Sequence, residues 1–203
     1  MRLHGDKILQ LIDSLFEELG LEYWLFFGTM LGAYREHGFI HHDDDIDLGM
    51  YTKDITESFI TSLVRTGFVL KRRKSTSDCA FRMVSFSYKG VTVDFYGFRL
   101  DEKNDLITGF ETHPIYGSWE ESQKQNKYCV CLVSYPYQGL TRLKFNRLLL
   151  PVPTNTDYVL KGLYGSAYMT PQKGNKGYSS TISKVFSTDV IFATRVNSFN
   201  VDY

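Results

Sequence analysis

The chain has 203 residues, a length that suits one substantial domain and is short for two. Lysine plus arginine equals aspartate plus glutamate at 23 each, so no net charge draws the protein to nucleic acid or to an anionic membrane. No run approaches 18 apolar residues, the first residues lack an apolar signal-peptide core and three cysteines form no disulfide framework, so we expect a cytoplasmic protein without a membrane span.

The first predicted elements are a helix and a short strand. Apolar residues recur at helical spacing over residues 7–19. The aromatic run at residues 23–27 has the length and composition of a strand. It breaks at Gly28-Thr29, where we expect a turn, and a short helix is predicted over residues 30–35.

The segment after this helix carries the strongest chemical signal in the chain. Asp43, Asp44 and Asp45 are consecutive, and Ile46 separates them from Asp47. Side chains alternate in a strand, so Asp45 and Asp47 should project to one face while Ile46 packs on the other. Two carboxylates this close repel each other, and a divalent cation such as Mg²⁺ (or Mn²⁺) removes that conflict. The alternative is a solvated acidic loop, the more common explanation of an acidic run alone.

A third carboxylate lies on a later predicted strand. A helix is predicted over residues 52–65, and residues 80–88 and 91–96 then form a hairpin. Asp94 falls on the polar face of the second strand, where a lone carboxylate is costly unless it has a partner. It is either a third ligand for the cation described above or the ion-pair partner of a neighbouring arginine such as Arg82.

The second half of the chain is less informative. Residues 97–140 can be assigned only to strands and loops, and we expect substrate specificity to lie in this middle region. Residues 140–152 predict another hairpin that turns at Asn146, and a helix follows that ends at Tyr164-Gly165.

Two segments resemble the LicD family, a branch of the nucleotidyltransferase-fold superfamily that includes the fukutin-type proteins. Residues 28–35 (GTMLGAYR) and 38–47 (GFIHHDDDID) are similar to the family pattern G-T-L-L-G-A-x-R followed by G-F-I-P-W-D-D-D-I-D. Residues 150–165 are similar to its closing P-x-P…Y-L…Y-G segment. The resemblance implies a single α/β (α+β) domain over residues 1–171, with a nucleotidyltransferase-like mixed sheet and flanking helices. Residues 172–203 would form a C-terminal tail that can pack on this domain.

The resemblance also implies roles for individual residues. Asp45, Asp47 and Asp94 would be the catalytic carboxylates and the ligands of Mg²⁺ or Mn²⁺. Gly28 and Thr29 would form the turn that cradles a substrate phosphate.

Two further residues are candidates for substrate binding. Arg35 is a candidate phosphate clamp, with a structural ion pair as the equally weighted alternative. His41-His42 stands where Pro-Trp is usual in the family, so His42 either contacts substrate or replaces a packing aromatic. We favour packing or a supporting role behind the residues that contact substrate, because a lone histidine is more often structural than catalytic.

Family members transfer a phosphoalcohol, such as phosphocholine, ribitol phosphate or glycerol phosphate, from a CDP-activated donor to a glycan hydroxyl. The resemblance therefore implies a Mg²⁺-dependent phosphotransferase of cell-surface polysaccharide or lipopolysaccharide biosynthesis, with a CDP-alcohol donor and a glycan acceptor as its partners. One alternative is a nucleotidyltransferase that moves NMP from an NTP to a small molecule or protein. Another is a non-catalytic binding module, and nucleic acid is the least expected partner.

Overall fold

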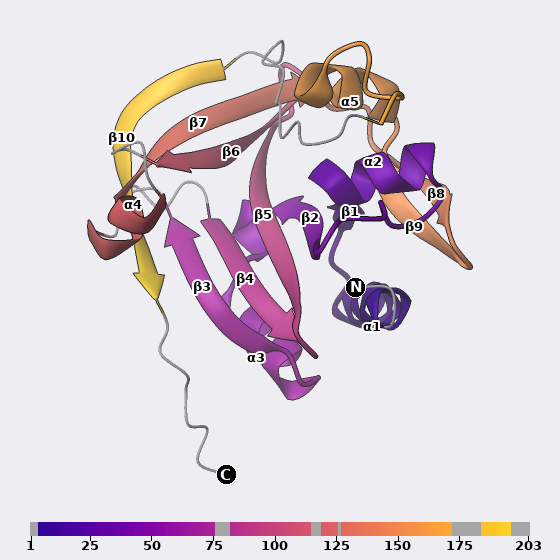
Figure 1. Cartoon of the computed structure of the whole chain (residues 1–203), viewed down its shortest axis with the longest axis horizontal. Helices are drawn as coiled ribbons and strands as arrows, with labels where there is room; N and C mark the ends of the chain where they lie inside the picture. The colour runs from indigo at the N-terminus through magenta and orange to yellow at the C-terminus, as the bar shows by residue number, and fades with distance from the viewer. Residues whose placement is uncertain (1–3, 76–81, 115–118, 126, 172–183, 196–203) are drawn as a thin grey trace.

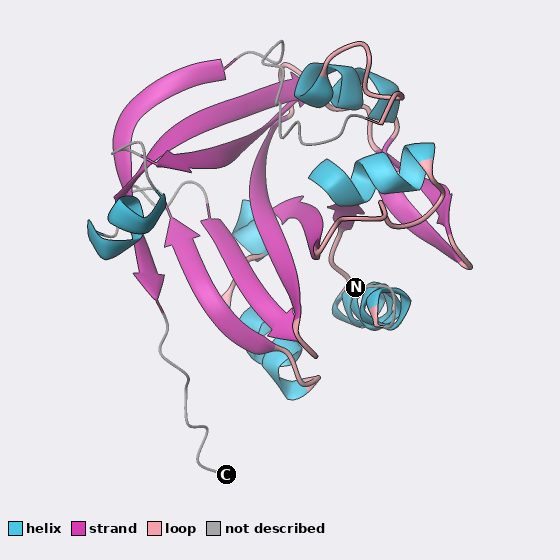
Figure 2. Ribbon diagram, viewed as in Figure 1, coloured by secondary structure: helices cyan, strands magenta, loops and turns pink. Residues whose placement is uncertain are grey.

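The strand-forming segments of the sequence assemble mainly into one strongly curled sheet with helices packed around it (Figures 1 and 2). The structure, a computed structural model, describes residues 4–75, 82–114, 119–125, 127–171 and 184–195. The helices are α1 (Gly5–Leu19), α2 (Phe27–Arg35), the 3₁₀ helix η1 (Thr52–Asp54), α3 (Glu57–Arg65), α4 (Trp119–Gln125) and α5 (Thr156–Tyr164). The strands are β1 (Tyr23–Leu25), β2 (Asp45–Tyr51), β3 (Val69–Ser75), β4 (Arg82–Tyr88), β5 (Val91–Asp101), β6 (Leu106–Pro114), β7 (Lys127–Pro136), β8 (Leu140–Phe145), β9 (Leu148–Pro153) and β10 (Lys184–Arg195). The predicted mixed α/β class is confirmed.

The main sheet has the strand order β1-β2-β5-β4-β3-β10-β7-β6. β2 and β5 pair in parallel, whereas the other neighbouring strands are antiparallel. The last part of the long strand β5 pairs again with β6, from Arg99 opposite Thr108 to Asp101 opposite Leu106. The strands β5, β4, β3, β10, β7 and β6 therefore form a closed circuit, and Figure 1 shows β6, β7 and β10 arching over the upper end of β3 and β4. β8 and β9 form a separate hairpin that contacts β1.

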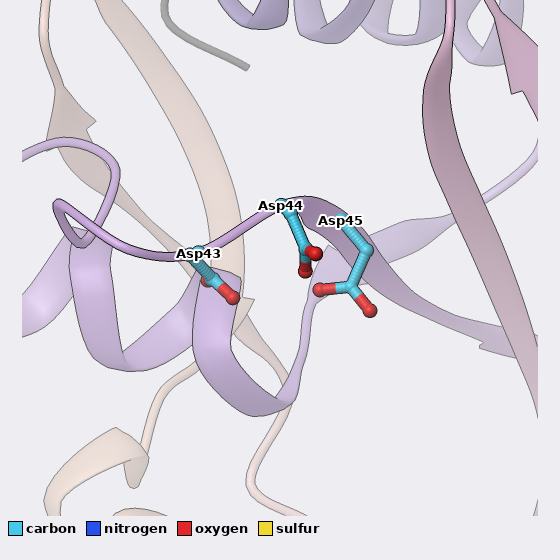
Figure 3. A group of neighbouring side chains, drawn as sticks. All are labelled: Asp43, Asp44 and Asp45. Atoms are coloured by element: carbon cyan, nitrogen blue, oxygen red, sulfur yellow. The ribbon is translucent and has the colours of Figure 1, made fainter. Parts of the chain in front are cut away.

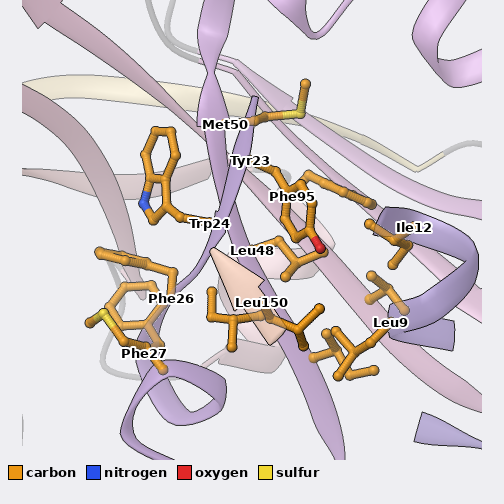
Figure 4. Close-up of a cluster of buried hydrophobic side chains, with 14 of the residues drawn as sticks. Leu9, Ile12, Tyr23, Trp24, Phe26, Phe27, Leu48, Met50, Phe95 and Leu150 are labelled. Atoms are coloured by element: carbon orange, nitrogen blue, oxygen red, sulfur yellow. The ribbon is translucent and has the colours of Figure 1, made fainter. Parts of the chain in front are cut away.

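The two faces of the central strands have different partners. One face packs on α1 and α3, where the rings of Phe16 and Phe59 lie 5.9 and 5.3 Å from the ring of Phe95. Figure 4 shows part of this apolar cluster between the sheet and α1. Each of these fully buried aromatic side chains contributes about 1.5–3 kcal/mol. The other face is turned toward β6, because Met83 of β4 packs with Phe110 of β6. The alternation of β5 places Asp94 on this second face.

Helix α2 begins earlier than the sequence predicts. β1 ends at Leu25 and α2 starts at Phe27, so Gly28 and Thr29 lie in the first turn of the helix rather than in a turn before it. Phe27 has a positive φ of 39°, which a residue other than glycine rarely adopts. This conformation turns the chain sharply from strand into helix, and such a change of direction is not encoded in hydrophobic periodicity.

Three other elements differ from the prediction. The helix expected over residues 52–65 divides into η1 and α3, because the Thr56 hydroxyl caps α3 by accepting a hydrogen bond from the Phe59 backbone N–H at 3.2 Å. Residues 119–125 form a helix in a region assigned to strands and loops. Residues 184–195, inside the expected tail, form β10 between β7 and β3.

Among the helices that the structure describes, none combines the length and the apolar character of a membrane span. The structure does not describe the cysteine side chains, so the absence of a disulfide framework stays a prediction.

Candidate active site

Three carboxylates meet where the parallel strands β2 and β5 lie side by side. Asp47 is the direct cross-strand partner of Asp94, and Asp45 precedes Asp47 on the same face of β2. One carboxylate oxygen from each of the three lies within 4.8 Å of the others. Asp47 and Asp94 are buried, with 9% and 7% of their surface exposed. The proximity expected from the alternation of both strands is therefore present.

The backbone of Asp47 is held from the side opposite β5. Its N–H donates a hydrogen bond to the Thr29 hydroxyl at 2.9 Å, and its carbonyl accepts one from the Phe26 N–H at 3.0 Å. Thr29 is buried, so its hydroxyl is committed to this contact. Thr29 and Phe26 thus hold the backbone that carries the Asp47 carboxylate, a contact that the sequence did not suggest.

Hydrogen bonds also orient the acidic side chains. The Ser85 hydroxyl of β4 donates to one oxygen of Asp94, and the Tyr96 hydroxyl donates to Asp47. The alternative partner for Asp94, Arg82, donates instead to the Ile55 carbonyl at 3.0 Å. Asp94 is therefore not neutralised by that arginine, and its second oxygen can serve a ligand.

Burial makes all three carboxylates reluctant to ionise. It raises the pKa of Asp47 far above its usual range, and the negative charges of Asp45 and Asp94 add to this effect. Burial and the charge of Asp94 raise the pKa of Asp45 in the same direction. The pKa of Asp94 is raised by burial and partly lowered again by the Ser85 hydrogen bond. Three converging carboxylates that repel one another fit a divalent cation with oxygen ligands.

A further aspartate lies closer to this centre than the sequence indicates. Asp43, Asp44 and Asp45 form a second acidic group, and Figure 3 shows their side chains on one side of the segment that enters β2. Burial, followed by the charges of Asp45 and Asp44, raises the pKa of Asp43 to about 7. Asp44, in contrast, is exposed. Only the acidic triplet signals Asp43 in the sequence, and it does not distinguish this half-buried residue from its exposed neighbour.

Residues 20–155 match the family model described as LicD/FKTN/FKRP, nucleotidyltransferase domain. The chain belongs to this family. The match covers more than half of the chain and includes the three converging carboxylates and the α2 residues that position them.

Several curated proteins are similar to this LicD-family chain. Ribitol-5-phosphate transferase FKTN from Mus musculus is 26% identical over 172 residues, which cover 85% of this chain and 34% of that protein. The Homo sapiens protein of the same name is 25% identical over the same coverage. Uncharacterized protein RT0683 from Rickettsia typhi is 31% identical over 113 residues, covering 54% of this chain and 37% of that protein. The chain spans about a third of the length of these relatives.

Arg35 and His42, the two further candidates for substrate binding in this LicD-family chain, lie in surroundings that differ from those expected. Arg35 lies at the opposite end of α2 from Gly28, about 10 Å away along the helix axis. Its guanidinium donates to the Tyr168 carbonyl at 3.0 Å and to Glu36 at 2.8 Å, which corresponds to the structural alternative. His42 is exposed, which does not fit the expectation that it replaces a packing aromatic.

Gly28 lies against Asp43 in this LicD-family site. A Cβ at Gly28 would lie 2.8 Å from Oδ2 of Asp43, so Gly28→Ala should displace that carboxylate. We expect the substitution to lower the melting temperature and the turnover, although alanine in a helix normally adds stability. A second substitution, Asp43→Gly, should remove most of the steric penalty.

The double-mutant cycle measures this contact directly. We expect a coupling of at least about 0.5 kcal/mol between the two positions in thermal unfolding. Additive effects on stability would show that Gly28 is not constrained by Asp43. Turnover that stays lost in a fully stable double variant would indicate that Gly28 itself approaches the donor phosphate, as the family resemblance implies.

Proposed function

We propose that this LicD-family protein is a phosphotransferase that moves a phosphoalcohol from a CDP-activated donor to a glycan hydroxyl in cell-surface polysaccharide biosynthesis. The observation that carries the proposal is the convergence of Asp45, Asp47 and Asp94 within 4.8 Å on a parallel strand pair. Family membership supports the same chemistry. The mammalian relatives are named ribitol-5-phosphate transferase, so ribitol phosphate is the first phosphoalcohol to test.

The three carboxylates would hold Mg²⁺ or Mn²⁺, which when bound neutralises the donor diphosphate and the charge on the departing CMP. The acceptor hydroxyl oxygen attacks the phosphorus of the alcohol phosphate, and the bond from that phosphorus to the bridging oxygen breaks. The products are a glycan phosphodiester and CMP, and the hydroxyl proton passes to a base.

Asp94 is the candidate base for that proton, provided that the cation does not occupy its available oxygen. The Ser85 hydroxyl donates to one of its oxygens, and burial raises its pKa, which makes the carboxylate a stronger base. Thr29 and Phe26 fix the backbone of Asp47, which would keep this ligand of the cation in position. These contacts would hold the carboxylates in one orientation for the reaction.

Nucleotide release tests the proposal. The protein is incubated with Mg²⁺ and with CDP-ribitol, CDP-choline, CDP-glycerol or each NTP, in the presence of a glycan acceptor mixture. Release of CMP from a CDP-alcohol, absent after chelation with EDTA, is the expected result. Pyrophosphate released from an NTP would support a nucleotidyltransferase instead, because the same three carboxylates would serve that reaction. Binding without release of either product would favour a non-catalytic module.

A further inference from the structure

A row of polar side chains extends beyond the carboxylates across two more strands. Asp47 of β2 is paired with Asp94 of β5, Asp94 with Ser85 of β4, and Ser85 with Arg72 of β3. Figure 1 shows β3, β4 and β5 side by side. Side chains at directly paired positions of neighbouring strands project to the same face of a sheet. Arg72 therefore stands on the carboxylate face, two strands from Asp94.

Lys74 occupies the next row on the same face. It lies two residues after Arg72 and is paired with Met83, which in turn is paired with Tyr96. Only 6% of its surface is exposed. The positive charges of Arg72 and Lys74 both lower the pKa of Asp94, which places them within electrostatic reach of that carboxylate.

Burial of the Lys74 side chain at this position disfavours its charged form. Met83 packs with Phe110 on this face, and burial lowers the pKa of Lys74 to about 8, an effect that Arg72 increases and Asp94 opposes. Arg73, between Arg72 and Lys74, has a different partner. Arg73 projects to the opposite face, where its guanidinium donates to the exposed Glu57 of α3 at 2.9 Å. β3 thus sends alternate basic side chains to a surface ion pair and to the carboxylate face.

The positive charges of Arg72 and Lys74 change how the site would interact with a phosphate ligand. One divalent cation leaves the three carboxylates with one negative charge in excess. The diphosphate of a CDP-alcohol carries two negative charges and would be repelled by such a site. Arg72 and Lys74 change this excess to one positive charge, and Asp43, when it is ionised, brings the total to zero, so the two cations remove the repulsion of the diphosphate.

We propose that Lys74 and Arg72 bind the diphosphate oxygens of the donor and make β3 the anion-binding wall that faces the carboxylates across β4. Neither residue belongs to the motifs that carry the family resemblance. For a CDP-alcohol the inference rests on the proposed function, while the anion chemistry is shared by any nucleoside diphosphate or triphosphate. Arginine can hold two phosphate oxygens with its planar fork, and lysine supplies a compact charge.

Calorimetry with Mn²⁺ and inorganic pyrophosphate tests the wall without assuming the donor. Arg72→Gln and Lys74→Met should each weaken Mn²⁺-dependent pyrophosphate binding about tenfold to a hundredfold, the loss of one charge-assisted contact. Arg73→Gln and Lys71→Met are matched controls, since Arg73 faces away and Lys71 is exposed on the same strand. Both controls should stay within about twofold of the unaltered protein, and Lys74→Arg should retain most of the affinity.

Mn²⁺ binding alone separates an anion-binding role from a structural one. Loss of a nearby positive charge should leave the affinity for Mn²⁺ unchanged or increase it. If Arg72→Gln and Lys74→Met tighten Mn²⁺ binding but leave pyrophosphate affinity unchanged, the two residues only balance the carboxylates and the inference is overturned. Should Lys74→Met fail to fold, Arg72→Gln, at the more exposed position, carries the same test.

The proposed function can fail independently. An unaltered protein that binds pyrophosphate through Arg72 and Lys74 but releases no CMP from CDP-ribitol would refute phosphoalcohol transfer and leave the anion wall standing. If CTP competed with pyrophosphate for binding and CDP-ribitol did not, phosphoalcohol transfer would likewise be refuted and the anion-binding role of β3 would stand. An unaltered protein that binds Mn²⁺ but no pyrophosphate would overturn the wall itself.

Discussion

Asp45→Asn and Asp47→Asn are each expected to reduce turnover by about a thousandfold or more. Asparagine keeps the size and the hydrogen-bonding capacity of the side chain but removes the negative charge that attracts a divalent cation. Stabilisation of a transferring phosphoryl group by a bound cation is worth several kcal/mol, and each ~1.4 kcal/mol corresponds to a tenfold change in rate. Steady-state assays over a range of Mg²⁺ concentrations measure both the loss and the change in cation dependence.

The same variants should be more stable than the unaltered protein when EDTA is present at pH 7. The pKa of Asp47 is raised in the folded state, so the folded protein loses stability as the pH rises above the unfolded value of about 4. Asparagine cannot ionise and removes this penalty. Melting temperatures in EDTA between pH 5 and pH 8 should therefore fall less steeply with pH for Asp47→Asn.

Asp44→Asn is the control for these substitutions, because Asp44 is exposed beside the same strand. It should cost less than about tenfold in turnover and leave stability unchanged. Equal, mild losses for all three variants with unaltered Mg²⁺ dependence would mean that the acidic run is a solvated loop. The phosphotransferase proposal would then lose its chemical basis.

Gly32→Ala is expected to destabilise the protein, although helix propensity alone predicts a gain of about 1 kcal/mol. A Cβ at Gly32 would lie 2.4 Å from the Gly38 carbonyl oxygen and 3.3 Å from the Ile40 nitrogen. These are backbone atoms of the loop that leads to the acidic segment, and they cannot rotate away. Overpacking of this kind costs about 1–3 kcal/mol, which should lower the melting temperature by several degrees.

A helix substitution without a steric conflict provides the comparison. Ser58→Ala lies on the exposed face of α3 and should leave the melting temperature unchanged or raise it slightly. If Gly32→Ala also raised it, the loop after α2 would not be packed as closely as the structure shows. Turnover of Gly32→Ala should fall together with stability, since the displaced loop continues into Asp43 and Asp45.

The sequence predicted the carboxylate centre better than it predicted the surroundings. Period-two alternation determines which face a side chain takes, so the common face of Asp45 and Asp47 followed from spacing alone. The partnership of Asp94 with Ser85 and Arg72 depends on register between strands, and spacing along the chain does not encode that. The phosphate-binding role of Gly28 and Thr29 is implied by the family resemblance, whereas the contact of the Thr29 hydroxyl with the Asp47 backbone depends on the start of α2 at Phe27, which spacing does not reveal. The closure of the sheet through β10 likewise depends on pairings between distant segments.

Strand β5 connects two different parts of the sheet. Its first part carries Asp94 between β2 and β4, and its last part, from Arg99, joins β6. Asp94 and Arg99 are five residues apart along this strand, which corresponds to about 17 Å of extended chain. A single continuous strand therefore belongs both to the centre that carries the carboxylates and to the seam that closes the circuit. A change in β6 or β7 that shifts this seam would reach the carboxylate face both along β5 and through the contact of Met83 with Phe110, so variation in these strands can reshape the substrate side of the site without replacing a carboxylate.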